Sequence, residues 1–134
     1  SDTNLRVVTR QDLSPGYITV QCIHAVTEFY QEHPALHQNW QKFSKAITLL
    51  AVKNEDELKI LIKQLTEKSI PLSIFIEPDI NNQVTAIAIA PSLEAKKLCS
   101  SIPLALKEYN KPQQINKHFT GINLNGPEGV VICQ

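Results

Sequence analysis

Residues 46 to 67 constrain the fold more than any other part of the chain. "AITLLAV", residues 46–52, is an uninterrupted apolar run, which is typical of a strand covered on both faces of a sheet. "NEDELKILIKQLTEK" follows directly, with apolar residues at helical spacing, Asn54 as a capping residue and Glu57 three positions later. A buried strand that leads at once into an amphipathic helix indicates an α/β domain.

The other segments complete this architecture. Strands are predicted at 5–9, 72–77 and 84–90, and helices at about 15–33, 34–43 and 92–100. The order of elements predicts an α/β fold: a four-stranded mixed sheet with helices on both faces. We assign residues 1–106 to this domain and residues 107–134 to a C-terminal extension. The extension allows a hairpin that turns at residues 125–129 and packs on the same domain.

The first long helix carries an unusual polar line. Tyr17, Gln21, His24 and Glu28 follow one another at helical spacing. Apolar side chains border this line on both sides, with Ile18, Cys22, Ala25, Val26 and Phe29 on one flank and Val20, Ile23 and Tyr30 on the other. We therefore expect the helix to be covered by the sheet on one side and by a partner on the other, with a narrow polar line exposed.

Composition excludes some classes of function. Thirteen basic and thirteen acidic residues cancel in this chain of 134 residues, so no global charge attracts nucleic acid or membrane, although a local basic patch stays open. Cys22, Cys99 and Cys133 are widely separated and predict neither a disulfide framework nor a metal-binding pair. No apolar run reaches membrane length and no signal-peptide core is present, so we expect a cytoplasmic location and no membrane contact.

Gln21 and His24 are the first candidate site residues. They lie near the start of the helix that follows the first strand, at the kind of sheet edge where α/β proteins bind ligands. His24 can act as acid, base or hydrogen-bond donor near neutral pH, and Gln21 can both donate and accept. The alternative is that both side chains satisfy backbone groups inside the core.

Glu77 is the second candidate, because it ends an otherwise apolar strand, and Thr85 on the next strand lies near it across the predicted hairpin. Arg10 and Asp12 follow the first strand and form either an ordinary ion pair or a contact for an anionic ligand. His33 and His37 have a spacing that can bind metal, but the helix boundary at Pro34 favours two solvated side chains. We expect no metal and no cofactor.

Two longer stretches resemble a known family. "VVTRQDLSPGYITVQCIHA" resembles the opening of the type 2 peptidyl-tRNA hydrolase family, whose motif is matched in order and spacing by Arg10, Asp12, Leu13, Gly16, Gln21, His24 and Ala25. "LSIFIEPDINNQVTAIAIAP" is similar to a later strand, loop and strand of the family, with Glu77 at the position of the family's Asp. Two departures stand out: Tyr17 replaces the family's lysine, and the loop before Thr85 is shorter.

The resemblance implies a metal-independent hydrolase of the ester between a peptide and the tRNA 3′ end, usually a homodimer. In this assignment Glu77 orients or activates water, His24 and Gln21 hold the site, and Tyr17 and Thr85 donate hydrogen bonds. Arg10, Asp12 and Gly16 would contact the peptidyl-tRNA. Two alternatives stay open: a related hydrolase acting on another small acyl substrate, and a non-catalytic binding module on the same fold.

Overall fold

The computed structural model describes residues 3–109 of the chain. Its elements are β1 (Leu5–Arg10), α1 (Pro15–Glu32), α2 (Pro34–Phe43), β2 (Ile47–Val52), α3 (Glu55–Glu67), β3 (Leu72–Glu77), β4 (Gln83–Ile89) and α4 (Leu93–Leu98), with 3-10 turns at Pro78–Ile80 and Lys107–Tyr109. Each predicted strand and helix is confirmed to within a few residues at its ends. The hairpin predicted at residues 125–129 lies outside the described residues, and the division at residue 106 stays a prediction.

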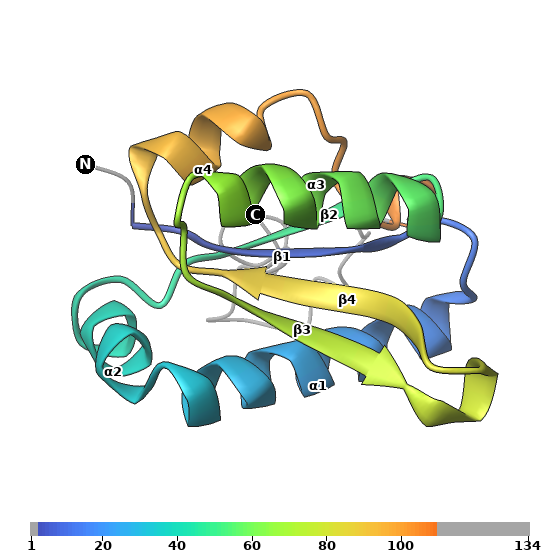
Figure 1. The fold of residues 1–134 in the computed structure, drawn as a ribbon, viewed down its shortest axis with the longest axis horizontal. Coiled ribbons are helices and arrows are strands. Elements are labelled where there is room, and N and C mark those ends of the chain that lie inside the picture. Colours follow the sequence, from blue (N-terminus) through green and yellow to red (C-terminus); the bar gives the residue numbers. More distant parts are fainter. Residues whose placement is uncertain (1–2, 110–134) are drawn as a thin grey trace, which may run out of the picture.

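The strands form one mixed sheet in the order β2-β1-β4-β3. β1 pairs in parallel with β2 and antiparallel with β4, which pairs antiparallel with β3. In Figure 1, α3 and α4 lie over one face of the sheet and α1 and α2 lie over the other. The predicted fold class, a four-stranded mixed sheet with helices on both faces, is therefore confirmed.

Each face of the sheet has its own apolar core. On the α3 face, Val8 and Ile87 pack with Leu58 and Leu61. On the α1 face, the buried alanines of β4 pack with Phe29 and Trp40. Burial of a side chain such as Phe29 stabilises the fold by about 1.5–3 kcal/mol. Because these alanines carry only a methyl group, α1 lies close to β4, and polar side chains on α1 come within reach of the strands.

The start of α3 shows how local sequence determines this fold. The Asn54 side chain accepts a hydrogen bond from the Glu57 N–H at 3.1 Å, as predicted. The Glu57 carboxylate reaches back to the Lys53 N–H at 2.8 Å, one residue earlier than in a standard capping box. Reciprocal capping of this kind satisfies backbone donors that the first helical turn leaves without partners.

Within the described residues α1 is covered by the sheet on one flank, as predicted, and the partner expected on the other flank stays a prediction. Its first flank packs on the sheet, where Ile18, Ala25 and Phe29 are buried. The second flank is open to solvent: Val20 is 49% exposed, Ile23 61% and Tyr30 56%. The polar line of α1 faces the β3 edge of the sheet, so Gln21 is buried rather than exposed.

Candidate active site

A chain of hydrogen bonds joins α1 to the ends of β3 and β4. The Gln21 Nε2 amide donates to Glu77 Oε1 at 2.9 Å, and the Thr85 hydroxyl donates to Gln21 Oε1. A carboxylate can only accept, so this chain has one consistent direction, from hydroxyl to amide to carboxylate. Gln21 and Thr85 are almost completely buried, at 1% and 0% exposed, and the site is therefore anchored in the core.

A β-bulge points the Thr85 side chain toward α1. Phe75 pairs with Ala86, but Ile76 pairs with Val84, so Thr85 is an extra residue in β4. Such an extra residue interrupts the alternation of side chains. Ala86 packs in the α1-side core, and Thr85 reaches α1 as well because it bonds to Gln21. The Thr9 hydroxyl donates to the Thr85 carbonyl at 2.9 Å and holds the bulge in place.

Glu77 is held as a carboxylate. Its Oε1 accepts from Gln21, and its Oε2 accepts from the Asp79 N–H at 3.2 Å in the turn that follows β3. The Gln21 hydrogen bond is the main cause that lowers the pKa of Glu77, followed by the Asp79 N–H, with a smaller contribution from nearby His24. Since hydrogen bonds to the charged form favour it, Glu77 is ionised at neutral pH. It is an acceptor that can orient or deprotonate a water molecule.

The Tyr17 hydroxyl is the unsatisfied group of this site. Its oxygen is buried and has no hydrogen-bond partner among residues 3–109. Burial raises the pKa of Tyr17, and the negative charges of Glu77 and Asp79 raise it further. The phenol therefore keeps its proton at neutral pH and is available as a hydrogen-bond donor near the Glu77 carboxylate.

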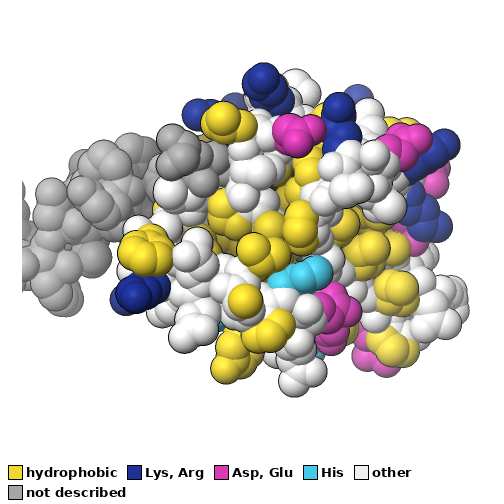
Figure 2. Space-filling model, turned by 60° about the vertical axis from the view of Figure 1, so that its left-hand side comes forward, with side chains coloured by type: hydrophobic (Ala, Val, Ile, Leu, Met, Phe, Trp, Pro, Cys, Tyr) yellow, Lys and Arg dark blue, Asp and Glu magenta, His cyan; other side chains and the backbone are white. Residues whose placement is uncertain are grey.

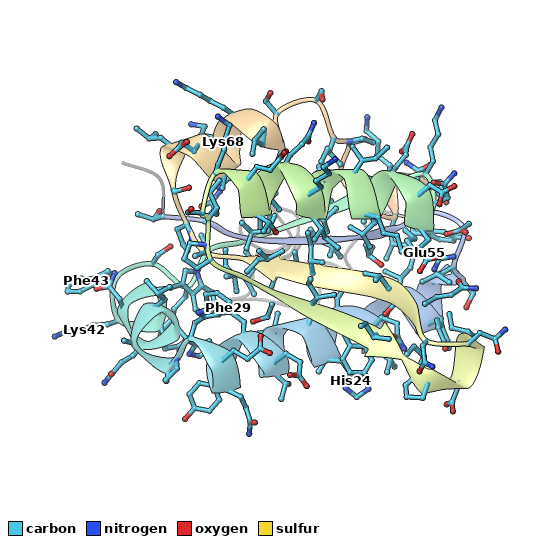
Figure 3. All side chains as sticks on the ribbon, in the orientation of Figure 1. His24, Phe29, Lys42, Phe43, Glu55 and Lys68 are labelled. Atoms are coloured by element: carbon cyan, nitrogen blue, oxygen red, sulfur yellow. The ribbon has the colours of Figure 1, made fainter. Side chains whose placement is uncertain are left out.

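His24 lies at the open side of the same site. Its ring stacks on Phe75, with ring centroids 4.3 Å apart and planes 8° from parallel. The His24 side chain is otherwise exposed, and Figure 3 shows it beside β3. Phe75 was not singled out from the sequence, although it lies two residues before Glu77 on β3 and therefore faces the same side.

Arg10 and Asp12 form the ion pair that was one of the two readings of the sequence. Arg10 Nε and one terminal nitrogen donate to the two Asp12 oxygens at 2.9 and 2.8 Å. The other terminal nitrogen donates to the Gln83 side chain at 2.8 Å and to the Val84 carbonyl at 3.1 Å. Four donors of the guanidinium are thus used within the fold. The predicted role of Arg10 and Asp12 in ligand binding stays a prediction.

Arg10 also faces away from the Glu77 side chain. Arg10 and Val8 are two residues apart on β1 and point to the same face, where Val8 packs in the α3-side core. Gln21 approaches Glu77 from α1, on the opposite face. The structure therefore brings together Tyr17, Gln21, His24, Glu77 and Thr85, whereas Arg10 and Asp12 form a second cluster across the sheet. Gly16 lies beside Tyr17, and a Cβ there would meet no atom within 4 Å, so close packing does not require glycine.

Replacing Asp12 by Ala is expected to lower the free energy of unfolding by about 1–2 kcal/mol. Arg10 is only 6% exposed and would lose two charged hydrogen bonds, but Asp12 is 43% exposed, so water can replace part of them. The Arg10 hydrogen bond lowers the pKa of Asp12 below 3.8. The contribution of the Arg10–Asp12 pair to the free energy of unfolding is therefore present above pH 3.8 and is lost as the pH falls through the folded-state pKa of Asp12.

Urea denaturation at several pH values measures the effect of Asp12→Ala. Glu67→Ala, at an exposed acidic residue that ends α3, is the control and is expected to change the unfolding free energy by less than about 0.5 kcal/mol. Equal effects of both substitutions would contradict a structural role for the Arg10–Asp12 pair.

The other two histidines within residues 3–109, His33 and His37, have structural contacts. His33 Nε2 donates to the Leu72 carbonyl at 3.0 Å, at the edge of the sheet, and is thus not simply solvated. His37 packs among Tyr30 and Trp40, with ring centroids 4.7 and 5.4 Å away. Within residues 3–109, no group of three His, Cys, Asp or Glu side chains is arranged to hold a metal ion. No described helix is both long enough and apolar enough to cross a membrane.

The fold and the site together define a class of protein: an α/β domain with a carboxylate at the end of its edge strand β3 and a buried phenol hydroxyl near that carboxylate. The model of the family "Peptidyl-tRNA hydrolase PTH2" matches residues 3–109. The chain therefore belongs to the type 2 peptidyl-tRNA hydrolase family, and the resemblance seen in the sequence is confirmed. No curated protein matches the chain.

A similar solved structure is that of a protein of unknown function, Atu0240, from Agrobacterium tumefaciens strain C58. It superposes with a TM-score of 0.58 at 12% sequence identity, over 75% of this chain and 96% of that one. At this identity the likeness supports the fold alone.

Proposed function

We propose that this chain hydrolyses the ester that joins a peptide to the 3′ end of tRNA. The observation that carries the proposal is the hydrogen-bonded Glu77 carboxylate close to the Tyr17 hydroxyl, which has no hydrogen-bond partner in the described part of the chain. Family membership supports peptidyl-tRNA as the substrate. We propose a cytoplasmic location, because peptidyl-tRNA is produced by translation.

In the proposed reaction Glu77 accepts a proton from a water molecule whose oxygen attacks the ester carbonyl carbon. The negative charge that develops on the carbonyl oxygen is stabilised by a hydrogen bond from Tyr17. The bond from the carbonyl carbon to the ribose oxygen then breaks, and that oxygen takes up the proton from Glu77. The products are a peptide with a free carboxyl group and a tRNA with a free 3′ end. No step is assigned to a metal.

Gln21 and Thr85 are positioning residues in this proposal. Gln21 is buried and holds one carboxylate oxygen of Glu77, and Thr85 holds Gln21 in turn. This arrangement leaves the Gln21 amide no freedom to turn its oxygen toward the carboxylate. His24 contributes a positive potential when protonated, which favours the ionised form of Glu77.

The RNA phosphates need basic or amide groups beyond the Glu77 cluster. In Figure 2 most Lys and Arg side chains lie along the upper and right-hand margins of the molecule, while hydrophobic side chains occupy the centre. Lys96 and Lys97 are basic residues in the last turn of α4. Gly16, in the first turn of α1, exposes backbone that a phosphate can approach, which supports its predicted contact with RNA. Arg10 and Asp12 stay in the proposal as substrate contacts outside the Glu77 cluster, on the other face of the sheet.

The proposal is tested by incubating the purified chain with N-blocked aminoacyl-tRNA that carries a labelled acyl group. We expect release of the labelled acid, with an established family member assayed in parallel. No release under conditions in which that family member is active would overturn the proposal.

A small acyl substrate is the second candidate. Zero net charge and the four internally used donors of Arg10 favour it, because both weaken the expected attraction for RNA. A screen of small esters and amides with wild type and Glu77→Gln separates it from the first candidate. Release from small esters but not from tRNA, with loss of activity in the variant, would favour this second candidate. Binding of tRNA without any hydrolysis would indicate the non-catalytic module.

We propose that the exposed flank of α1 is the contact surface of a homodimer. Beside this flank, Val7, Cys22, Ile23, Val26, Ile47, Leu49 and Leu106 are the apolar members of the lining of a groove of about 410 Å³. Exposed apolar side chains gathered beside a groove are found at many protein interfaces. Tyr30, further along the flank, is an aromatic residue of the kind enriched in such contacts.

Ile23→Asp is expected to convert the dimer into a monomer without unfolding it. Ile23 is 61% exposed, so the charge is tolerated in the single chain but opposes burial in an interface. Ile60→Asp on α3, where Ile60 is 59% exposed, is the matched control and should leave the dimer intact. Light scattering during size-exclusion chromatography measures the mass. A monomeric wild type, or equal behaviour of both variants, would contradict the proposed interface.

A further inference from the structure

We propose that the open face of the His24 ring is the binding site for the terminal adenine of the tRNA. This inference rests on the proposed function and adds to it the subsite that recognises the nucleotide next to the scissile ester. The ligand class is a single-stranded RNA end with an unstacked purine base. Such bases are commonly bound by stacking on aromatic side chains.

The orientation of the His24 ring is determined by stacking. Its plane lies 8° from that of Phe75, with the centroids 4.3 Å apart. Phe75 is half-buried and packs against the α1-side core, so it provides a rigid support. Because Phe75 covers one face of the ring and His24 is exposed, the opposite face is the one available to a ligand. A flat ring held in this way loses little conformational entropy when a base stacks on it.

The position of this ring matches the chemistry of the substrate. The ester is attached to the ribose of the last nucleotide, so the base of that nucleotide must lie close to the reacting carbonyl. His24 follows Gln21 by three residues on α1, about one helical turn. Phe75 precedes Glu77 by two residues on the same side of β3. The stacked pair therefore borders the Glu77 carboxylate from both elements that build the site.

A purely structural explanation makes a different prediction. If His24 only shields Phe75 from water, removal of the ring affects stability and not the recognition of a base. If His24 instead acts in proton transfer, a phenyl ring cannot replace it. The stacking proposal requires that a phenyl ring replace imidazole and that alanine fail to do so.

The experiment measures the affinity of the full chain for the trinucleotide CCA and for the same trinucleotide with an abasic last residue. For His24→Ala we expect CCA affinity to fall by about 5- to 150-fold, with no change for the abasic ligand. His24→Phe is expected to stay within about threefold of wild type for CCA, a range set by the sequence-tolerant nature of stacking. Thr27→Ala, an exposed residue one turn further along α1, is the matched control and should not change either affinity.

Kinetics provides a second readout. With N-blocked aminoacyl-tRNA, His24→Ala should raise KM because binding energy for the base is lost, and His24→Phe should restore KM. Equal CCA affinity in wild type and His24→Ala, or equal losses in the Ala and Phe variants, would overturn the proposal. Base-dependent binding of CCA without hydrolysis would reject the proposed function and leave this subsite standing. Hydrolysis without base-dependent binding would support the proposed function and reject this subsite.

Discussion

Replacing Glu77 by Gln is expected to lower kcat for peptidyl-tRNA by about 10²- to 10⁴-fold, the usual contribution of a positioned general base. Glutamine has nearly the same shape but no negative charge to take up a proton from water. Its one side-chain oxygen can still accept the hydrogen bond from Gln21 Nε2, which is 2.9 Å from the carboxylate in the native protein. The hydrogen bond from the Asp79 N–H is lost, but this contact is exposed, so water can replace it. The fold and the substrate affinity should therefore be retained while the chemical step is lost.

The comparison is made with single-turnover kinetics on labelled N-blocked aminoacyl-tRNA, and circular dichroism verifies the fold. Glu55→Gln is the matched control, because Glu55 also accepts a backbone N–H, that of Val84 at 2.8 Å, but lies at the start of α3 across the sheet. It should keep wild-type kcat. Equal rates for wild type and Glu77→Gln would eliminate Glu77 as the group that acts on water.

The same carboxylate determines how activity depends on acidity. Hydrogen bonds from Gln21 and from the Asp79 N–H lower the pKa of Glu77 below its usual value of 4.5. The ionised form, and with it the activity, should persist as the pH decreases to 4.5 and be lost only below it. The stability that these bonds contribute has the same sign: it is present above pH 4.5 and is lost as the pH falls through the folded-state pKa.

Local signals explain why so much of the fold was predictable. The start of α3 is encoded by Asn54 and Glu57, three residues apart, and the capping contact that they predict is present. The strands were recognised from apolar runs and from alternation, which depend on near neighbours. The polar line on α1 follows from helical periodicity alone, and its members Tyr17, Gln21 and His24 do lie at the site.

The contacts that make the site depend on long-range packing. Gln21 and Glu77 are 56 residues apart, and neither residue indicates the distance between α1 and β3. That distance depends on the small alanines of β4, which let the helix approach. The bulge at Thr85 is also absent from the alternation pattern, which would place Thr85 and Ala86 on opposite faces.

Arg10 shows that the residues of one contiguous sequence motif do not all lie at one place in the fold. Arg10 precedes α1 by only a few residues, and it matches the family motif together with Gln21 and His24. On β1, however, alternation directs it to the α3 face, where Asp12 and Gln83 occupy its donors. Alternation along β1 therefore separates Arg10 from the Glu77 cluster, while the contact of Arg10 with the substrate stays a prediction.

Replacing Tyr17 by Phe is expected to lower kcat by about 10²- to 10³-fold, the effect of removing one oxyanion donor. Phe keeps the ring and removes only the hydroxyl, whose oxygen is buried and has no partner in the described part of the chain. The thermal midpoint should not fall, because a buried hydroxyl without a hydrogen bond does not stabilise the fold. Loss of rate without loss of stability distinguishes a catalytic hydroxyl from a structural one.

Tyr17→Lys completes the test, since lysine is the residue of the family motif at this position. An ammonium group that feels the negative charges of Glu77 and Asp79 should be well accommodated, and it can donate to the developing oxyanion as the phenol does. We therefore expect the Lys variant to retain hydrolysis, whereas the Phe variant does not. Hydrolysis in the Lys variant alone, with an inactive wild type, would mean that the natural chain is a binding module in which tyrosine has replaced the functional donor. Equal activity of wild type, Phe and Lys variants would instead move the oxyanion donor to another group.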